Sequence, residues 1–242
     1  MTETLLVHEI YLSIQGESTF AGLPCAFVRL TGCDLRCSYC DTVYAFKGGK
    51  RMAIKEIIDE LNSTCDFKGI KGNKLPLVEI TGGEPLLQKN VHALMTQLCD
   101  IGLTVLIETS GAHSIKTCDP RVHNIMDWKC PSSGESDQMK RENIANLKPT
   151  DEVKFVIGTW EDYAWAKAQI EKFQLTGICP VLFSWVAPIA EHQRDTSLKS
   201  IPNDHTPIAL NKLAEQITND RLPIRFQLQM HKFIWSPDKK GV

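Results

Sequence analysis

The chain has 242 residues, of which 43% are hydrophobic and 23% are charged. With 27 basic and 29 acidic side chains it carries a net charge of −2, which gives no overall attraction to nucleic acid or to an anionic membrane. No apolar run approaches the ~20 residues that a membrane helix needs, and the first residues lack the pattern of a signal peptide. We therefore expect a single cytoplasmic domain over residues 1–242, with neither nucleic acid nor membrane as a partner.

Six short apolar segments alternate with helical patterns along the chain. The segments are rich in β-branched residues and nearly continuous, as strands buried on both faces are. They cover 25–30, 76–81, 104–109, 123–128, 152–157 and 179–186. Helices with one apolar face are predicted at 53–62, 91–102, 160–173 and 206–219. This order predicts βαβ units around a parallel sheet, which fits either an incomplete α/β barrel or a doubly wound sheet.

Polar motifs follow four of the predicted strands. A cysteine-rich loop follows 25–30, and the other motifs are 81–84, 108–111 and 127–129. Active residues of parallel sheets gather at the carboxyl ends of the strands, so we expect the functional site at this edge.

The loop TGCDLRCSYCD contains Cys33, Cys37 and Cys40 in the spacing C-x3-C-x2-C. Three soft thiolates on one loop can hold three corners of a [4Fe–4S] cluster, and one iron would then stay open to a reactant. A structural zinc site is the alternative, but zinc sites usually show C-x2-C pairs with a second pair or histidines further on. The other cysteines are scattered and are interpreted as small buried hydrophobic residues: 25, 65, 99, 118, 130 and 179.

The segment ITGGEP, residues 80–85, suits a tight turn between a strand and a helix. It also suits a ligand, because glycines let ligand atoms approach the backbone and the Glu84 carboxylate can accept from an ammonium group. Together with the cysteine loop, this motif resembles the radical S-adenosylmethionine (SAM) superfamily. The resemblance implies a partial α/β barrel with parallel strands, in which the GGE segment holds the amino group of SAM.

A narrower resemblance covers the chain from about residue 10 to the end. It rests on SIQGES, GLPCAFVRLTGCDLRCSYCDT, ITGGEP, ETSG, DWKCPSSGE and QLQMHKFIW. These segments are similar to the 7-carboxy-7-deazaguanine synthase family, which acts on the route to queuosine. The resemblance implies a lyase that converts 6-carboxy-5,6,7,8-tetrahydropterin to 7-carboxy-7-deazaguanine with ring contraction and loss of ammonia.

The same resemblance assigns site residues. Substrate contacts map onto Ile14, Gln15, Gly16, Glu17, Arg29 and Thr81. SAM contacts map onto Gly83, Glu84, Ser110, Asp127, Trp128, Lys129 and Ser184, and Thr42 matches the ligand of a Mg²⁺ ion. Amide and carboxylate groups suit the pterin edge, and Arg29 suits the substrate carboxylate as a two-pronged donor. An internal Asp or Glu is the other partner that an arginine in an apolar strand could have.

The family also implies the chemistry and the partners. SAM is cleaved to a 5′-deoxyadenosyl radical that takes a hydrogen from the carbon bearing the substrate carboxylate, so no single residue is assigned as an acid or base. A flavodoxin-like protein would supply the electron, and the enzyme would be a homodimer. Where the family often has QGEG and Ser-Pro, this chain has Ser18 and Trp185. We expect His231 to be structural, in a late strand or turn whose Phe233 and Trp235 pack the open side of the barrel.

Two other functions share part of this pattern. An activase that makes a glycyl radical on a partner protein would have the cysteine loop and GGE, but the QGE and CDT segments disfavour it. A zinc-bearing or cluster-bearing binding module would leave GGEP and ETSG unexplained.

Overall fold

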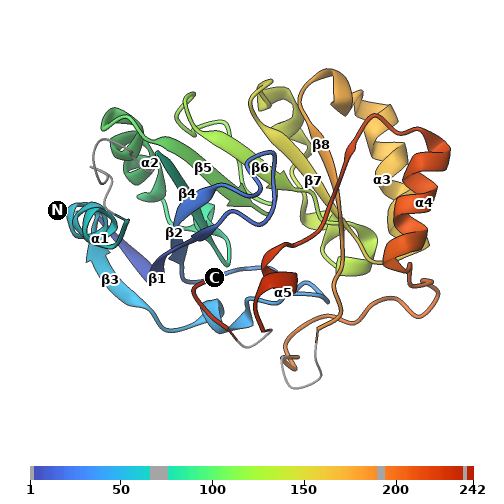
Figure 1. The fold of residues 1–242 in the computed structure, drawn as a ribbon, viewed down its shortest axis with the longest axis horizontal. Helices are drawn as coiled ribbons and strands as arrows, with labels where there is room; N and C mark the ends of the chain where they lie inside the picture. Colours follow the sequence, from blue (N-terminus) through green and yellow to red (C-terminus); the bar gives the residue numbers. More distant parts are fainter. Residues whose placement is uncertain (1–2, 66–75, 190–193, 237–238) are drawn as a thin grey trace.

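The computed structural model describes residues 3–65, 76–189, 194–236 and 239–242. Its centre is a nine-stranded sheet with the strand order β3-β1-β2-β4-β5-β6-β7-β8-β9 (Figure 1). The strands are β1 Thr4–Ile14, β2 Pro24–Leu30, β3 Lys50–Ala53, β4 Leu77–Gly82, β5 Thr104–Thr109, β6 His123–Asp127, β7 Glu152–Ile157, β8 Val181–Trp185 and β9 Arg225–Gln227. Pairing is parallel from β2 through to β9, whereas β1 and β3 are added antiparallel at one end.

Helices follow most of the parallel strands. The α-helices are α1 Ile54–Cys65, α2 Val91–Asp100, α3 Trp160–Phe173, α4 Leu210–Asp220 and the short α5 His231–Ile234. The 3₁₀ helices are η1 Val43–Phe46, η3 Pro85–Leu87, η4 Pro131–Ser133, η5 Ser136–Gln138, η6 Arg141–Asn146 and η7 Leu175–Gly177. None of the helices in the described ranges is long and apolar enough to cross a membrane.

The predicted parallel α/β fold is confirmed. All six predicted strands are present, and they lie side by side in chain order as β2, β4, β5, β6, β7 and β8. A doubly wound sheet would reverse its strand order at a switch point, and this sheet does not, so the partial barrel is the correct alternative. The sequence patterns missed β1, β3 and β9, which belong to the antiparallel extension and to the far edge.

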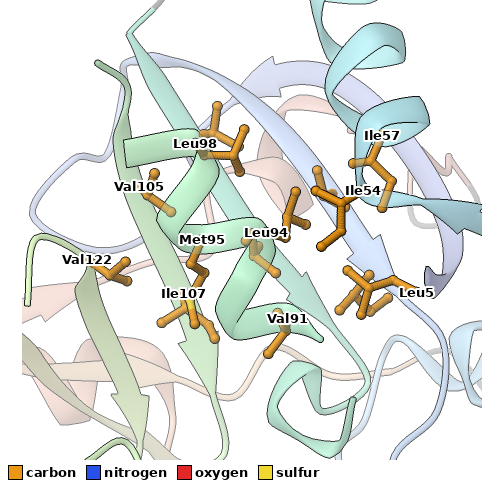
Figure 2. Packing of buried hydrophobic residues seen from close by; sticks show 14 of the residues in the cluster. Leu5, Ile54, Ile57, Val91, Leu94, Met95, Leu98, Val105, Ile107 and Val122 are labelled. Carbon is orange, nitrogen blue, oxygen red and sulfur yellow. The ribbon is translucent and has the colours of Figure 1, made fainter. Parts of the chain in front are cut away.

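One core fills the space between the sheet and the first two helices. In α1, Ile54, Ile57 and Leu61 recur at helical spacing and are buried, and α2 does the same with its own apolar stripe. Figure 2 shows Met95 and Leu98 of α2 beside Val105 and Ile107 of β5, with Ile54 and Ile57 of α1 on the other side of α2. Because each helix buries one stripe on the sheet, the strands keep their other face for the barrel interior.

The second core packs α3 and α4 against β6, β7 and β8. It is aromatic at its centre, where the Trp128 and Phe155 rings stack with centroids 5.8 Å apart and Trp165 meets Trp128 edge-on at 6.1 Å. Aromatic pairs of this geometry stabilise a core beyond the area that they bury.

The interior face of the sheet changes from apolar to polar along the strands. Leu77, Leu106 and Ile125 form a buried apolar layer with Tyr11 and Phe27. Two residues further along β4, β5 and β6, on the same face, stand Glu79, Glu108 and Asp127. Each strand therefore carries an acidic side chain toward its carboxyl end, above an apolar floor.

The scattered cysteines are mostly buried, as predicted. Cys25, Cys99, Cys130 and Cys179 are buried, and Cys118 is half-buried against the first core. The Cys65 side chain lies outside what the structure describes.

Candidate active site

A cavity of about 820 Å³ opens at the carboxyl ends of the strands. Its walls come from the cysteine loop, the strands β2 and β4 to β8, α5 and the last residues of the chain. Figure 1 shows α5 and the C-terminus near each other, on the same side of the sheet. The site residues predicted from the sequence that line it are Ile14, Gln15, Gly16, Glu17, Arg29, Cys33, Cys37, Cys40, Thr42, Thr81, Gly83, Ser110, Asp127 and Lys129. Three predicted residues are absent from the lining: Glu84, Trp128 and Ser184.

The cysteine loop is held from distant parts of the chain. The Arg36 N–H donates to the Glu135 carboxylate at 2.6 Å, and the Ser38 hydroxyl donates to the Ser132 carbonyl at 2.7 Å. On the outer side, the Lys199 N–H donates to the Arg36 carbonyl at 2.8 Å, and its Nζ donates to Glu135 at 2.7 Å. The loop is therefore fixed by the segment after β6 and by the segment that precedes α4.

The three thiols share an apolar surrounding with Leu35 and Ala112. Burial raises the pKa of Cys37 to about 11 and that of Cys40 to about 12, and it raises the pKa of Cys33 as well. A buried thiolate needs a compensating positive charge, which coordinated iron supplies.

The three thiols line the same cavity, where together they can bind one metal group. In a [4Fe–4S] cluster each thiolate binds a different iron, so the ligands need not converge. The dry surrounding of this loop and its three thiols therefore fit the cluster.

The two glycines of the GGE segment pack against the cysteine loop. The Gly83 N–H donates to the Leu30 carbonyl at 3.2 Å, and the Glu84 N–H donates to the Gly32 carbonyl at 2.8 Å. A Cβ on Gly83 would lie 2.7 Å from the Cβ of Cys33 and would also meet the Gly32 carbonyl. Glycine is required here because two backbone segments touch, in addition to any approach by a ligand.

The Glu84 side chain is not part of the cavity lining, and its predicted contact with SAM stays a prediction. Glu84 is fully buried, and its carboxylate accepts hydrogen bonds from the Ser110 N–H at 2.7 Å and the Ser110 hydroxyl at 2.6 Å. It also accepts from the Thr109 hydroxyl at 2.9 Å and from the Leu86 N–H at 2.9 Å. With its acceptors occupied by the chain, Glu84 joins the GGE segment to residues 109–110 and leaves Gly83 and Ser110 facing the cavity.

We expect Glu84→Gln to destabilise the fold by about 2–4 kcal/mol. The glutamine amide places an NH2 group where a carboxylate oxygen accepted hydrogen bonds, so the N–H and O–H groups that faced this oxygen lose their acceptor. Urea unfolding, read as a change in midpoint at constant slope, measures this. Glu171→Gln, on the exposed side of α3, is the control and should change stability by less than about 0.5 kcal/mol. Equal stability of the two variants would contradict the role given to Glu84.

The side chains of residues 127–129 point in two directions, toward the cavity and toward the core. Asp127 and Lys129 both line the cavity and form an ion pair at 2.8 Å. Burial disfavours the Lys129 ammonium, but the Asp127 carboxylate outweighs it and raises the pKa of the lysine. Alternation along the strand turns the Trp128 ring into the aromatic core, and the predicted SAM contact of this residue stays a prediction.

Ser184 is not part of the cavity lining, and its predicted SAM contact stays a prediction. Ser184 lies in β8 with no exposed surface, and within the described residues its hydroxyl has no hydrogen-bond partner. The residues that follow it, from Trp185 to Pro188, line the cavity instead.

The QGES segment forms a tight turn at the cavity rim. Gln15 donates from its side-chain amide to Glu79, and its side-chain carbonyl accepts from the Glu17 N–H. Ser18 takes φ +64°, the left-handed region that favours glycine, and Gln227 bonds to both its N–H (3.1 Å) and its carbonyl (2.5 Å). The serine is therefore accommodated where the family often has glycine.

Arg29 lines the cavity and has an internal partner. Its Nε pairs with Glu9 at 2.8 Å, and its Nη2 donates to the Tyr11 hydroxyl at 2.6 Å. The Arg29 side chain is 13% exposed. Burial opposes its charge, yet the neighbouring tyrosines and Glu9 hold the pKa of Arg29 above its usual value. The guanidinium is thus pre-oriented and charged at the cavity wall.

Thr42 and Asp41 present hard oxygen atoms at the end of the cysteine loop. The Thr42 hydroxyl donates to Asp41 at 2.8 Å, and Lys232 pairs with the other oxygen of Asp41 at 2.7 Å. Both residues line the cavity. A hydroxyl and a carboxylate are ligands that Mg²⁺ accepts together with water or substrate oxygens.

The expected role of the last segment needs correction. His231 begins the short helix α5 rather than lying in a strand, and it lines the cavity close to Gly16. Phe233 is 60% exposed and does not pack into the barrel.

Sequence reasoning missed Lys154 and Glu79, and it placed Glu108 in a motif at this edge without giving it a role; all three line the cavity. Lys154 is 2% exposed and contacts Glu17, Glu108 and Asp127. The signal was available: charged residues stood inside the predicted buried strands 76–81, 104–109 and 152–157, where a charge needs a partner.

A parallel partial barrel whose three-cysteine loop and Gly-Gly-Glu turn meet in one cavity defines a radical SAM enzyme. Residues 27–119 match the family described as Radical SAM superfamily. Membership of that superfamily implies a [4Fe–4S] cluster and SAM as cofactors.

The chain belongs to the 7-carboxy-7-deazaguanine synthase family. It is 42% identical to the 7-carboxy-7-deazaguanine synthase of Chlorobaculum tepidum, over 98% of this chain and 97% of that protein. It is 43% identical to that of Koribacter versatilis, over 98% of this chain and 99% of that protein. The crystal structure of QueE from Escherichia coli shares the fold with a TM-score of 0.69 and 18% identity, covering 94% of this chain and 95% of that one.

Proposed function

We propose that the chain is a 7-carboxy-7-deazaguanine synthase. It converts 6-carboxy-5,6,7,8-tetrahydropterin to 7-carboxy-7-deazaguanine with loss of ammonia, by radical SAM chemistry in 7-deazapurine biosynthesis. The observation that carries this is one cavity that joins the cysteine loop, the charged Arg29 and the QGE turn. Near-full-length relatives of the same name support it.

The substrate side of the cavity is formed by residues 14–17, Arg29 and Thr81. Arg29 supplies a charged, planar donor for the substrate carboxylate, and Glu9 and Tyr11 hold its side chain in place. Gln15 and Glu17 supply acceptors for the N–H groups of the pterin edge. These side chains bind and orient the ring, which is where most of the protein's contribution to such a reaction lies.

The cofactor side is formed by the cysteine loop, Gly83, Ser110, Asp127 and Lys129. Cys33, Cys37 and Cys40 would hold the cluster, which with SAM supplies a carbon-centred radical that abstracts hydrogen from the substrate. Gly83 and Ser110 would hold the methionine end of SAM, and Lys129 would donate to its carboxylate. Trp128 packs in the second core, on the other side of this wall from the cavity.

A Mg²⁺ ion near Thr42 is part of the proposal. Thr42 and Asp41 would hold it at the cavity wall that also carries Arg29, so it would meet a substrate carboxylate bound there. For the electron donor and the oligomeric state the support is the family resemblance: we propose a flavodoxin-like reductant, a homodimer, and one functional domain over residues 1–242.

The proposed function is tested by anaerobic reconstitution followed by turnover. We expect about four irons per chain, cleavage of SAM under reduction, and conversion of the carboxylated pterin. Zinc in place of iron, without SAM binding, would support a binding module instead. An inert pterin together with a radical formed on a partner protein would support the activase.

We expect Arg29→Ala to lower kcat/KM for the pterin about a hundredfold, mainly through KM, because a charged hydrogen-bond partner of the substrate is lost. Initial rates at varied pterin concentration measure this, with iron content and SAM affinity unchanged. Arg121→Ala removes an exposed arginine paired with Asp119 and Asp100 outside the cavity, and it should leave KM as it is. An unaltered KM in Arg29→Ala would show that the substrate carboxylate does not bind this arginine, whose partners would then be Glu9 and Tyr11.

A further inference from the structure

A single buried lysine stands between the two sides of the cavity. Lys154 of β7 is 2% exposed, and its ammonium pairs with Glu17 at 2.8 Å and more closely with Glu108. The Asp127 carboxylate is 3.6 Å away and is also bound by Lys129. Glu17 belongs to the QGE turn, Glu108 to β5 and Asp127 to β6, so one cation meets three elements of the wall.

The charged groups that face this lysine are otherwise acidic. Glu79 on β4 lies in the same cavity, where burial and the nearby Glu108 carboxylate raise its pKa and favour its neutral acid form. His231 on α5 approaches Glu17, and burial lowers the pKa of that histidine, which favours its neutral form. Among the described residues, Lys154 and Lys129 are therefore the cations that contact this group of carboxylates, which consists of Glu17, Glu108 and Asp127.

The balance of charge depends on Lys154. Burial opposes the Glu17 carboxylate, but Lys154, with smaller contributions from His231 and Gln229, outweighs burial and lowers the pKa of Glu17 to about 2. For Glu108, burial dominates and raises the pKa, and Lys154 limits the rise. Burial also opposes the ammonium itself, yet the carboxylates of Glu108 and Glu17 raise the pKa of Lys154 well above its usual value.

A purely structural ion pair is the alternative. Buried ion pairs often add little to stability compared with apolar residues of the same size, so stability alone does not explain a lysine at this position. The position of Lys154 in the cavity wall explains the lysine, because removing Lys154 leaves adjacent carboxylates that repel one another and take up protons.

We propose that Lys154 is a positioning residue whose buried ammonium pairs with Glu17, Glu108 and Asp127, keeps the Glu17 carboxylate ionised, and so joins the pterin side of the cavity to the SAM side. The part that concerns the pterin rests on the proposed function. In this arrangement Glu17 accepts from the pterin edge, and Asp127 keeps Lys129 oriented toward SAM.

The test replaces Lys154 with methionine and with arginine in the reconstituted enzyme. In Lys154→Met the carboxyl groups hold protons at neutral pH and lose their acceptor role, and they regain it as the pH rises. We expect KM for the pterin to be raised about tenfold at pH 6.5 and to approach the wild-type value at pH 8.5, since one pKa unit corresponds to a factor of ten. Lys154→Arg keeps the charge and should show a KM ratio to wild type that does not change with pH.

A second readout is independent of turnover. A carboxyl group whose folded-state pKa exceeds its unfolded value loses stability as the pH rises through that interval. The melting temperature of Lys154→Met should therefore fall further below wild type at pH 8.5 than at pH 6. Lys148→Met is the matched control, because it also removes a lysine from a buried carboxylate, Asp151, but away from the cavity. It should leave the pH dependence of KM unchanged.

The outcomes separate cleanly. A KM ratio and a melting-temperature gap that are both independent of pH in Lys154→Met would overturn the proposal. If the wild-type enzyme leaves the pterin unchanged, the proposed function fails, and the melting-temperature gap still decides whether Lys154 holds the carboxylates. Should Lys154→Met not fold, the double variant with Glu108→Gln decides: recovery of folded protein supports the proposal, and no recovery overturns it.

Discussion

Cys37→Ala should abolish turnover, lowering it by more than about a thousandfold, because the cluster loses one of only three protein ligands. Cys37 is the most enclosed of the three by position, packed with Leu35 and Ala112. The alanine leaves the fold intact, since one thiol is removed from a loop whose hydrogen bonds are made by its backbone and by Ser38. Iron content and SAM cleavage measure the loss, with circular dichroism as the check on folding.

Cys118→Ala is the matched control. Cys118 is half-buried beside the first core and does not line the cavity. The variant should bind the full complement of iron and turn over at the wild-type rate. Full iron content and SAM cleavage in Cys37→Ala would mean that the cysteine loop is not the cluster site.

Gly83→Ala should lower turnover by about a thousandfold or more without removing any ligand. The new Cβ would lie 2.7 Å from the Cβ of Cys33, and it would meet the Gly32 carbonyl, so the cysteine loop or the GGE turn must shift. Both neighbours are held by backbone hydrogen bonds and cannot move aside as a flexible side chain would. We expect low iron content after reconstitution. We also expect the free energy of unfolding to fall by about 2–3 kcal/mol, which lowers the denaturant concentration at which the variant unfolds.

Gly177→Ala provides the comparison. A Cβ at Gly177 has nothing within 4 Å, and this residue does not line the cavity. Its stability and iron content should match wild type. If Gly83→Ala bound iron normally and retained its activity, the contact between the two segments would not matter for assembly of the site.

The parallel part of the fold follows from the sequence because its strands are buried on both faces. Continuous apolar runs such as 104–109, and helices such as Trp160–Phe173, leave few alternatives. The antiparallel strand Thr4–Ile14 has a mixed burial pattern, and Arg225–Gln227 is three residues long, so neither gives a strong pattern. Thr4–Ile14 lies between β3 and β2, and Arg225–Gln227 lies at the edge of the sheet beside β8, so each is extended because of its pairing and not because of its own pattern.

The sequence motifs predicted which segments form the candidate site. They did not predict which side chains within those segments face the cavity, because that depends on the direction of each side chain. The cysteine loop, Arg29 and the QGE turn reach the same cavity. Glu84 and Trp128 belong to motifs that reach the site, yet their own side chains point into the protein. Local pattern does not reveal which residue of a motif faces the ligand and which one supports it. Lys154 shows the converse, because it is outside every motif and lies within the site.

The support of the cysteine loop has a consequence for the life of the nascent chain. The loop is complete only when Arg36 is bonded by Glu135 and by Lys199, about 100 and 160 residues further along. A ribosome that has made residues 1–50 has made all three cysteines but none of these supports. Iron delivered at that stage would meet exposed, unsupported thiols. The hydrogen bonds that hold the cysteine loop can therefore form only after residue 199 has been made.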